Sequence, residues 1–177
     1  LEQVFNVDGY LRYMAVMISM SCWDMYPYTG NNFYLYNNPG TGKFEWIPWD
    51  LTWGGDIEMP LYSLQGPGLV ERAPLYDRVF EVERYRLQYA AYLDLLTKFW
   101  FNYENMAKTA KGYSSLIYPY LSQSAGDKDF FGEEAMFENV METFQYAWEE
   151  IAGFTQSRSA YIQQQLKILP LDENLTP

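Results

Sequence analysis

One predicted β-hairpin in the first third of the chain constrains the fold most. The turn-forming run NNPGTG at residues 37–42 separates two short segments rich in aromatic residues, 33–36 and 43–48. Such segments on either side of an Asn, Pro and Gly turn predict a pair of antiparallel strands. A hairpin brings its two ends together. Residues just before Phe33 and just after Pro48 are therefore expected to lie close in space.

Helical periodicity governs most of the remaining chain. Asp8 is the predicted N-cap of a first helix that ends near residue 22, and loops are predicted at 23–32 and from Trp49 to about Ala73. Further helices are predicted at 85–99, at 104–121 with Pro119 closing it, at 137–151, and at 156–169 with Pro170 stopping it. The sequence thus predicts an α+β fold that is mainly helical, with at least four helices after Ala73.

Composition narrows the classes of function. The net charge of −11 disfavours nucleic acid as a partner, because such a chain repels phosphate backbones. The chain has no histidine, which excludes His-dependent catalytic triads and His–Cys zinc sites. Its one cysteine, Cys22, is predicted to be a buried apolar residue. No apolar run of the length needed to cross a membrane is present, so no membrane span is predicted.

The chemistry is predicted at the two ends of the hairpin. Asp24, Asn31 and Asn32 precede it and Asp50 follows it. Two carboxylates and an amide oxygen form the kind of hard-oxygen site that Mg²⁺ or Mn²⁺ prefers. Protein kinases use the same order of parts, from a catalytic Asp and an Asn through a hairpin to a metal-binding Asp. Asp and Asn are also common turn and cap residues, and that alternative stays open at this point.

Several segments resemble successive motifs of the CotH (spore coat protein H) family of atypical protein kinases. They are the run NVDGYLRYMA from Asn6, the pair Trp23-Asp24, the run NFYLY from Asn32, the run IPWDL from Ile47, the segment 74–89, and the closing helix at 158–166. The resemblance extends from Asn6 to about Leu169. It implies a protein-kinase-like C-terminal lobe that transfers phosphate from ATP to serine or threonine of coat or surface proteins.

The resemblance also implies roles for individual residues. Asp24 matches the catalytic base and Asp50 matches the Asp that binds Mg²⁺ or Mn²⁺ with ATP. Asn32 is the expected amide ligand, with Asn31 as the second choice. Family members often carry a second acid two positions after the metal-binding Asp, and here that position is Thr52. Asp56, from the same loop, is a candidate to compensate.

The resemblance further implies that residues 1–170 form the C-terminal lobe of a kinase domain, with a frayed tail at 171–177. The lobe that would cover the triphosphate is expected to lie outside these residues, so the chain is expected to be inactive alone. The lysines are expected to be surface charges rather than ATP ligands: Lys43, Lys98, Lys108 and Lys111. The exposed lobe interface, with Tyr34, Trp46 and Trp49 as candidates, is expected to favour self-association.

Two other classes of function remain open from the sequence. One is a non-catalytic structural or interaction module of a spore coat or cell surface. The other is a carbohydrate-binding or glycosidase-like protein, suggested by tryptophans near paired acids: Trp23, Trp46, Trp49 and Trp53. The expected substrate of the kinase alternative is a serine-rich protein of the coat or surface, and the expected location is the spore coat or the exterior of the cell.

Overall fold

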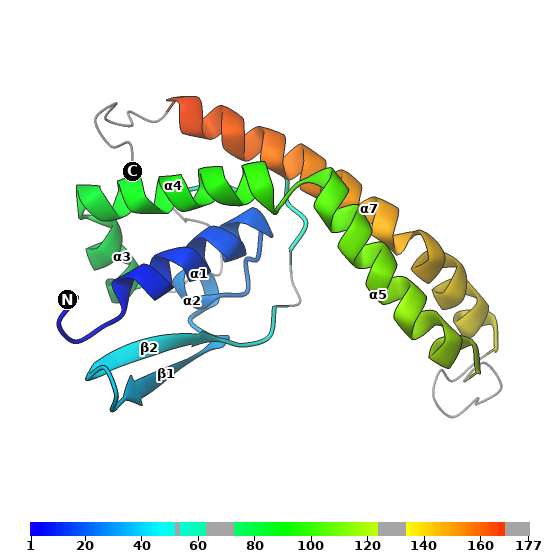
Figure 1. The fold of residues 1–177 in the computed structure, drawn as a ribbon, viewed down its shortest axis with the longest axis horizontal. Coiled ribbons are helices and arrows are strands. Elements are labelled where there is room, and N and C mark those ends of the chain that lie inside the picture. Colours follow the sequence, from blue (N-terminus) through cyan, green and yellow to red (C-terminus); the bar gives the residue numbers. More distant parts are fainter. Residues whose placement is uncertain (52–53, 63–72, 124–133, 169–177) are drawn as a thin grey trace. The chain divides into compact units, whose positions relative to one another are not determined.

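The computed structural model describes residues 1–51, 54–62, 73–123 and 134–168, with backbone alone for residues 121–123 and 134–145. In chain order the elements are α1 (Val7–Ser19), α2 (Tyr26–Thr29), β1 (Phe33–Asn38), β2 (Lys43–Pro48), α3 (Pro74–Phe80), α4 (Glu83–Phe99), α5 (Tyr103–Gln123) and α7 (Glu134–Ile168) (Figure 1). The described part is therefore mainly helical with one two-stranded antiparallel hairpin, as predicted. The chain divides into two compact units. Residues 1–99 with 158–177 form one, and residues 100–157 form the other.

Helix α1 is the central helix of the first unit. Tyr10, Leu11 and Met14 are fully buried in its core. The N-cap is Asn6, whose Oδ1 accepts a hydrogen bond from the backbone N–H of Gly9 at 3.0 Å, so the prediction of Asp8 as the cap is wrong. The helix also ends earlier than predicted, because Ser21 adopts a left-handed backbone conformation with φ of 55°.

The hairpin packs on α1 through one face. Its register pairs Phe33 with Pro48 at one end and Asn38 with Lys43 at the other. Trp46 is buried on the inner face, where its ring stacks on Phe33 with centroids 4.2 Å apart. The prediction that Trp46 belongs to an exposed apolar patch is therefore wrong. Strand alternation turns this side chain toward the core while its neighbours face solvent.

Helices α3 and α4 and the end of α7 from Arg158 also belong to the first unit. The predicted helix at 85–99 is confirmed as α4, and Tyr89 and Leu93 are fully buried on its inner side. The short helix α3 was not predicted, although its first residue is Pro74, a residue that favours the first turn of a helix. The predicted frayed tail at 171–177 lies outside the described residues.

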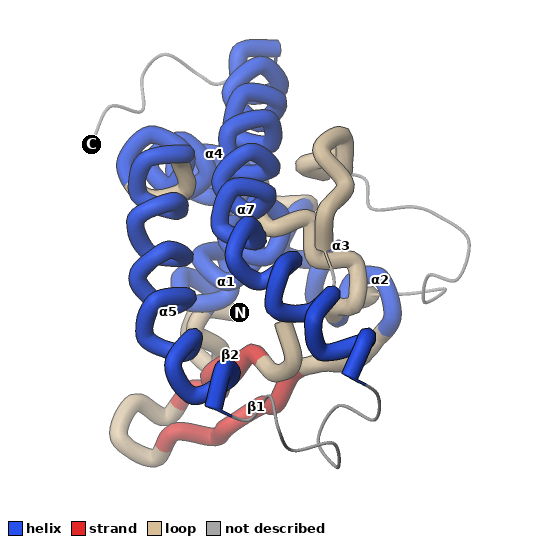
Figure 2. The backbone as a smooth tube through the Cα atoms, turned by 90° about the vertical axis from the view of Figure 1, so that its right-hand side faces the viewer, coloured by secondary structure: helices blue, strands red, loops and turns tan. Residues whose placement is uncertain are grey.

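The second unit is a pair of helical segments, seen as the tubes of α5 and α7 in Figure 2. Phe101 and Phe154 meet edge to face, and the Lys111 amine lies over the ring of Trp148 at 5.2 Å. Helix α5 continues through Pro119, so Pro119 does not close it as predicted. The helices predicted at 137–151 and 156–169 are one continuous helix, α7. None of the described helices has the length and apolar character required to cross a bilayer.

Candidate active site

A ring of three side-chain donors surrounds the carboxylate of Asp24, which is half-buried after the end of α1. The hydroxyl of Thr29 donates to Oδ1 at 2.8 Å and the amide of Asn31 donates to the same oxygen at 3.1 Å. The amide of Asn32 donates to Oδ2 at 2.8 Å. Gly30 ends the single turn of α2 in the left-handed region with φ of 78°, which turns the chain back toward the carboxylate.

Asn32 is fixed by two hydrogen bonds from one nitrogen. Its Nδ2 donates to the backbone carbonyl of Asp24 at 2.8 Å as well as to the Asp24 carboxylate. Both partners are acceptors only, so the orientation of the amide is determined. Its Oδ1 therefore points away from Asp24. Asn32 also has φ of 60°, a conformation that asparagine tolerates better than most residues.

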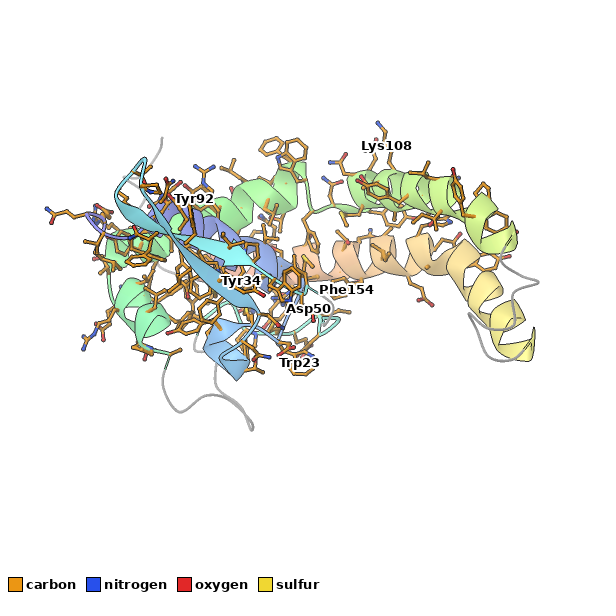
Figure 3. The ribbon with its side chains drawn as sticks, turned by 90° about the horizontal axis from the view of Figure 1, so that it is seen from below. Trp23, Tyr34, Asp50, Tyr92, Lys108 and Phe154 are labelled. Atoms are coloured by element: carbon orange, nitrogen blue, oxygen red, sulfur yellow. The ribbon has the colours of Figure 1, made fainter. Side chains whose placement is uncertain are left out.

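The hairpin carries Asp50 to the same end of the sheet. The N–H of Trp49 donates to the carbonyl of Asn32 at 3.1 Å, which extends the strand pairing one residue beyond Phe33 and Pro48. Asp50 follows directly, exposed and with φ of 46°. Figure 3 labels Trp23, Tyr34 and Asp50 in the region of the hairpin. The structure thus brings Asp24 and Asn32 into contact and places Asp50 next to the strand partner of Asn32.

The donor set suits a cation that keeps part of its hydration shell. Within the described ranges, no three His, Cys, Asp or Glu side chains gather to hold a metal ion. A site of one carboxylate and one amide oxygen fits Mg²⁺, which binds through one or two protein groups and keeps water and phosphate as its other ligands. The Asp56 carboxylate caps its own loop, because its Oδ1 accepts from the backbone N–H of Glu58 at 2.9 Å. Thr52 lies outside the described residues.

Exposed aromatic rings are neighbours in sequence of Asp24 and Asp50. Trp49 is 59% exposed and meets the ring of Tyr34 edge to face at 5.7 Å. Trp23, next to Asp24, is 46% exposed, whereas Trp53 lies outside the described residues. On α2, burial raises the pKa of Tyr28 to about 12. That phenol therefore stays neutral at physiological pH.

The four lysines considered from the sequence lie in other surroundings. Lys43 is at the opposite end of the hairpin from Asp24 and Asp50, as the strand register shows. Lys98 forms an exposed ion pair with Asp94 at 2.6 Å. Lys108 and Lys111 are exposed on α5. None of these four lysines is therefore assigned to the candidate site.

Two residues of this region were not predicted from the sequence. Thr29 contacts the Asp24 carboxylate, and its position between a Pro and a Gly in the loop was the available signal. Arg158 is fully buried and donates to the backbone carbonyls of Ile18, before Asp24, and of Ile57, after Asp50. An arginine on an amphipathic helix gives no such signal, because most arginines there are solvated.

Comparison with known proteins identifies the class. The model of the family described as CotH kinase protein matches residues 1–162. The chain therefore belongs to the CotH kinase family, which confirms the resemblance seen in its motifs. It is 27% identical over 166 residues to inner spore coat protein H of Bacillus subtilis (strain 168). That alignment covers 93% of this chain and 42% of the relative, so the chain spans less than half the length of the curated protein it matches.

Proposed function

We propose that this chain supplies the catalytic base and the metal ligands of an ATP-dependent protein kinase. The family implies ATP as the phosphate donor. The observation that carries the assignment is the double hydrogen bond from Asn32 Nδ2 to Asp24, because it orients a base and an amide ligand with one group. Asp and Asn residues that serve only as turn residues usually form hydrogen bonds with backbone groups one or two positions away. A side-chain contact across eight positions is less expected of them.

Asp24 is the proposed general base. Its Oδ1 already accepts from Thr29 and Asn31, while Oδ2 accepts from Asn32 and, among the described residues, from no second donor, so that it retains a lone pair. That oxygen takes the proton of a serine or threonine hydroxyl. The hydroxyl oxygen forms a bond to the γ-phosphorus as the bond between that phosphorus and the β–γ bridging oxygen breaks. ADP leaves with the bond electrons.

Asp50 and Asn32 are the proposed ligands of Mg²⁺ or Mn²⁺. Such an ion would neutralise the developing negative charge on the phosphates. The protein's contribution is the fixed direction of Asn32 Oδ1 and the carboxylate of Asp50 at the neighbouring end of β2. Since the matched relative is more than twice as long, we assign the groups that cover the triphosphate to a region outside this match.

The name of the relative is the basis for the proposed substrate and location. Its name describes an inner spore coat protein. We propose a serine-rich coat or surface protein as the acceptor and the spore coat or cell surface as the site of action. Tyr34 and Trp49 remain candidates for a contact with another protein or a second copy, since both rings are exposed.

A carbohydrate-binding role is the second candidate, and the exposed Trp23 and Trp49 favour it. Tryptophan rings at a surface offer flat apolar faces on which sugars stack. Binding of glycans by the chain, with no effect of Mn²⁺ and ATP, would support this candidate or a purely structural module over a kinase.

Transfer of radiolabelled phosphate from ATP to a serine-rich acceptor tests the proposal. We expect transfer from a fusion that joins this chain to the unmatched part of the relative, and none from the chain alone. Asp24→Asn in the fusion should abolish transfer. Asp77→Asn, an exposed acid in α3, is the control that should retain it. Equal transfer by the Asp24→Asn and control fusions would refute the assignment of the base.

A further inference from the structure

Arg158 is a fully buried cation whose hydrogen bonds, in the part of the chain that the structure describes, all go to backbone carbonyls. Its Nη1 donates to the carbonyls of Ile57 and Met59, both at 2.7 Å. Its Nη2 and Nε donate to the carbonyl of Ile18 at 2.8 and 3.3 Å. None of the ion pairs found within the described ranges involves Arg158.

These carbonyls belong to the two segments that carry the proposed site. Ile18 lies in the last turn of α1, and the chain runs from there directly to Asp24. Ile57 and Met59 belong to the described segment 54–59, which follows Asp50 in the sequence. The guanidinium therefore holds the end of α1 and the loop after Asp50 through a single side chain from the C-terminal part of α7.

Two further contacts join the same segments close to Arg158. The hydroxyl of Ser21 donates to the carbonyl of Asp56. Gly54 packs so tightly on the end of α1 that a Cβ at this position would lie 2.3 Å from the carbonyl oxygen of Met20. The loop at 54–59 is thus tied to α1 at three places, and Arg158 supplies the only charge among these ties.

The environment of Arg158 explains how the charge is held. The carbonyl ends of a helix carry partial negative charge and favour a cation. The guanidinium also lies over the ring of Tyr161 at 5.3 Å. Burial lowers the pKa of Arg158 relative to its ordinary value, yet guanidinium groups stay protonated in proteins. A buried charge of this kind fixes one register of the loop, since an apolar residue could not donate to three carbonyls.

We propose that Arg158 is a positioning residue that sets the loop carrying Asp50 against the loop carrying Asp24. This inference rests on the proposed function for its effect on ATP and metal, and on the contacts above for the clamp itself. Loss of the clamp should displace Asp50 while leaving the hairpin in place, because Trp46 anchors the hairpin independently.

Two substitutions and two controls separate the clamp from general stability. Arg158→Lys keeps the charge but loses the fork that reaches three carbonyls. Gly54→Ala forces the loop away from Met20 without touching Arg158. Arg78→Lys is the control for the first, since Arg78 is exposed and pairs with Glu81 on the surface. Gly112→Ala is the control for the second, because a Cβ there meets no atom within 4 Å.

Amide hydrogen exchange is measured for all four variants at a temperature where circular dichroism shows them folded. We expect exchange of the hydrogen-bonded amides of Glu58 and Met59 to rise by about tenfold or more in Arg158→Lys and Gly54→Ala, with the amides of β1 and β2 unchanged. The affinity for Mn²⁺ with ATP should fall in the same two variants and not in the controls. Arg158→Lys retains the positive charge but not the forked geometry of the donors. If Arg158 acted through its charge alone, this variant would keep the affinity for Mn²⁺ with ATP.

Unchanged protection of the Glu58 and Met59 amides in folded Arg158→Lys would overturn the clamp, and so would an equal rise in exchange over the whole first unit. Unchanged affinity for Mn²⁺ with ATP in a variant with a loosened loop would overturn the positioning role. If the fusion that joins this chain to the unmatched part of the relative transfers no phosphate, the proposed function fails, and the exchange comparison on the chain still decides the clamp.

Discussion

The side-chain nitrogen of Asn32 donates to both the backbone carbonyl and the carboxylate of Asp24, each at 2.8 Å. One amide thus fixes the position of the Asp24 backbone and the direction of its carboxylate. Eight positions separate the two residues, and the short helix α2 and Gly30 fold the chain back between them. The pair is the part of the candidate site that the structure defines best.

Replacing Asn32 by glycine should remove the amide without straining the backbone. Glycine accepts φ of 60° more readily than any other residue, so the loss is confined to the side chain. We expect the affinity for Mn²⁺ with ATP to fall by about 10- to 100-fold, measured by calorimetry. Asn31→Gly is the matched control and should have the smaller effect, and the reverse order would assign the amide ligand to Asn31.

Thr29→Val should impair transfer in the fusion while leaving the fold intact. Valine keeps the shape of threonine and loses the donor to Asp24 Oδ1. We expect kcat to fall by about tenfold with little change in the KM for ATP, because the base and not the metal loses a partner. Thr29→Ser retains a hydroxyl and should restore most of the rate. A fall in kcat of equal size in Thr29→Ser would contradict the hydrogen-bonding role.

Trp46→Ala should destabilise the first unit by about 3–5 kcal/mol, the usual range for removing a buried large aromatic. Its ring stacks on Phe33 and contacts Tyr10 and Tyr26 edge to face. Trp49 is exposed and directly follows β2, so Trp49→Ala should lower the free energy of unfolding by less than about 1 kcal/mol. Urea denaturation followed by circular dichroism measures both. Equal losses would show that the hairpin is not anchored through Trp46.

Alkaline pH should unfold the first unit through its buried tyrosines. Burial raises the pKa of Tyr28 and of Tyr62 to about 12 each. Unfolded tyrosine titrates near pH ~10, so the stabilising contribution of the neutral phenols is complete below that pH. It is lost as the pH rises through the folded values. The loss of helix in circular dichroism should accompany the last phenolate absorbance to appear as the pH rises toward about 12. Full phenolate absorbance without loss of helix would contradict the burial of these groups.

The hairpin could be predicted, and with it the position of Asn32 and Asp50 next to its paired ends, because turn chemistry is local. A Pro-Gly turn and alternating strands define the register without reference to the rest of the chain. The burial of Trp46 could not be predicted in this way. Aromatic residues occupy both faces of the hairpin, and only packing on α1 decides which face is covered.

Helix boundaries and Arg158 illustrate what required tertiary information. Asn6 and Asp8 are both good capping residues, and the competing contacts of Asp8 with Arg12 and Gln88 draw its side chain elsewhere. The helices predicted at 137–151 and 156–169 are one helix, since the glycine between them weakens a helix without ending it. Arg158 has the appearance of a solvated charge in the sequence, and its three carbonyl partners come from distant segments.

Paramagnetic broadening by Mn²⁺ tests the central claim, that Asn32 and Asp50 hold a metal ion beside Asp24. Nuclear magnetic resonance spectra of the 177-residue chain are recorded with a non-hydrolysable ATP analogue and trace Mn²⁺. We predict broadening centred on the side-chain amide of Asn32 and on the backbone amides of residues 49–51, reversed by excess Mg²⁺. Asp50→Asn should abolish it and Asp77→Asn should not. Broadening spread over the acidic surface, or unchanged in Asp50→Asn, would contradict the account.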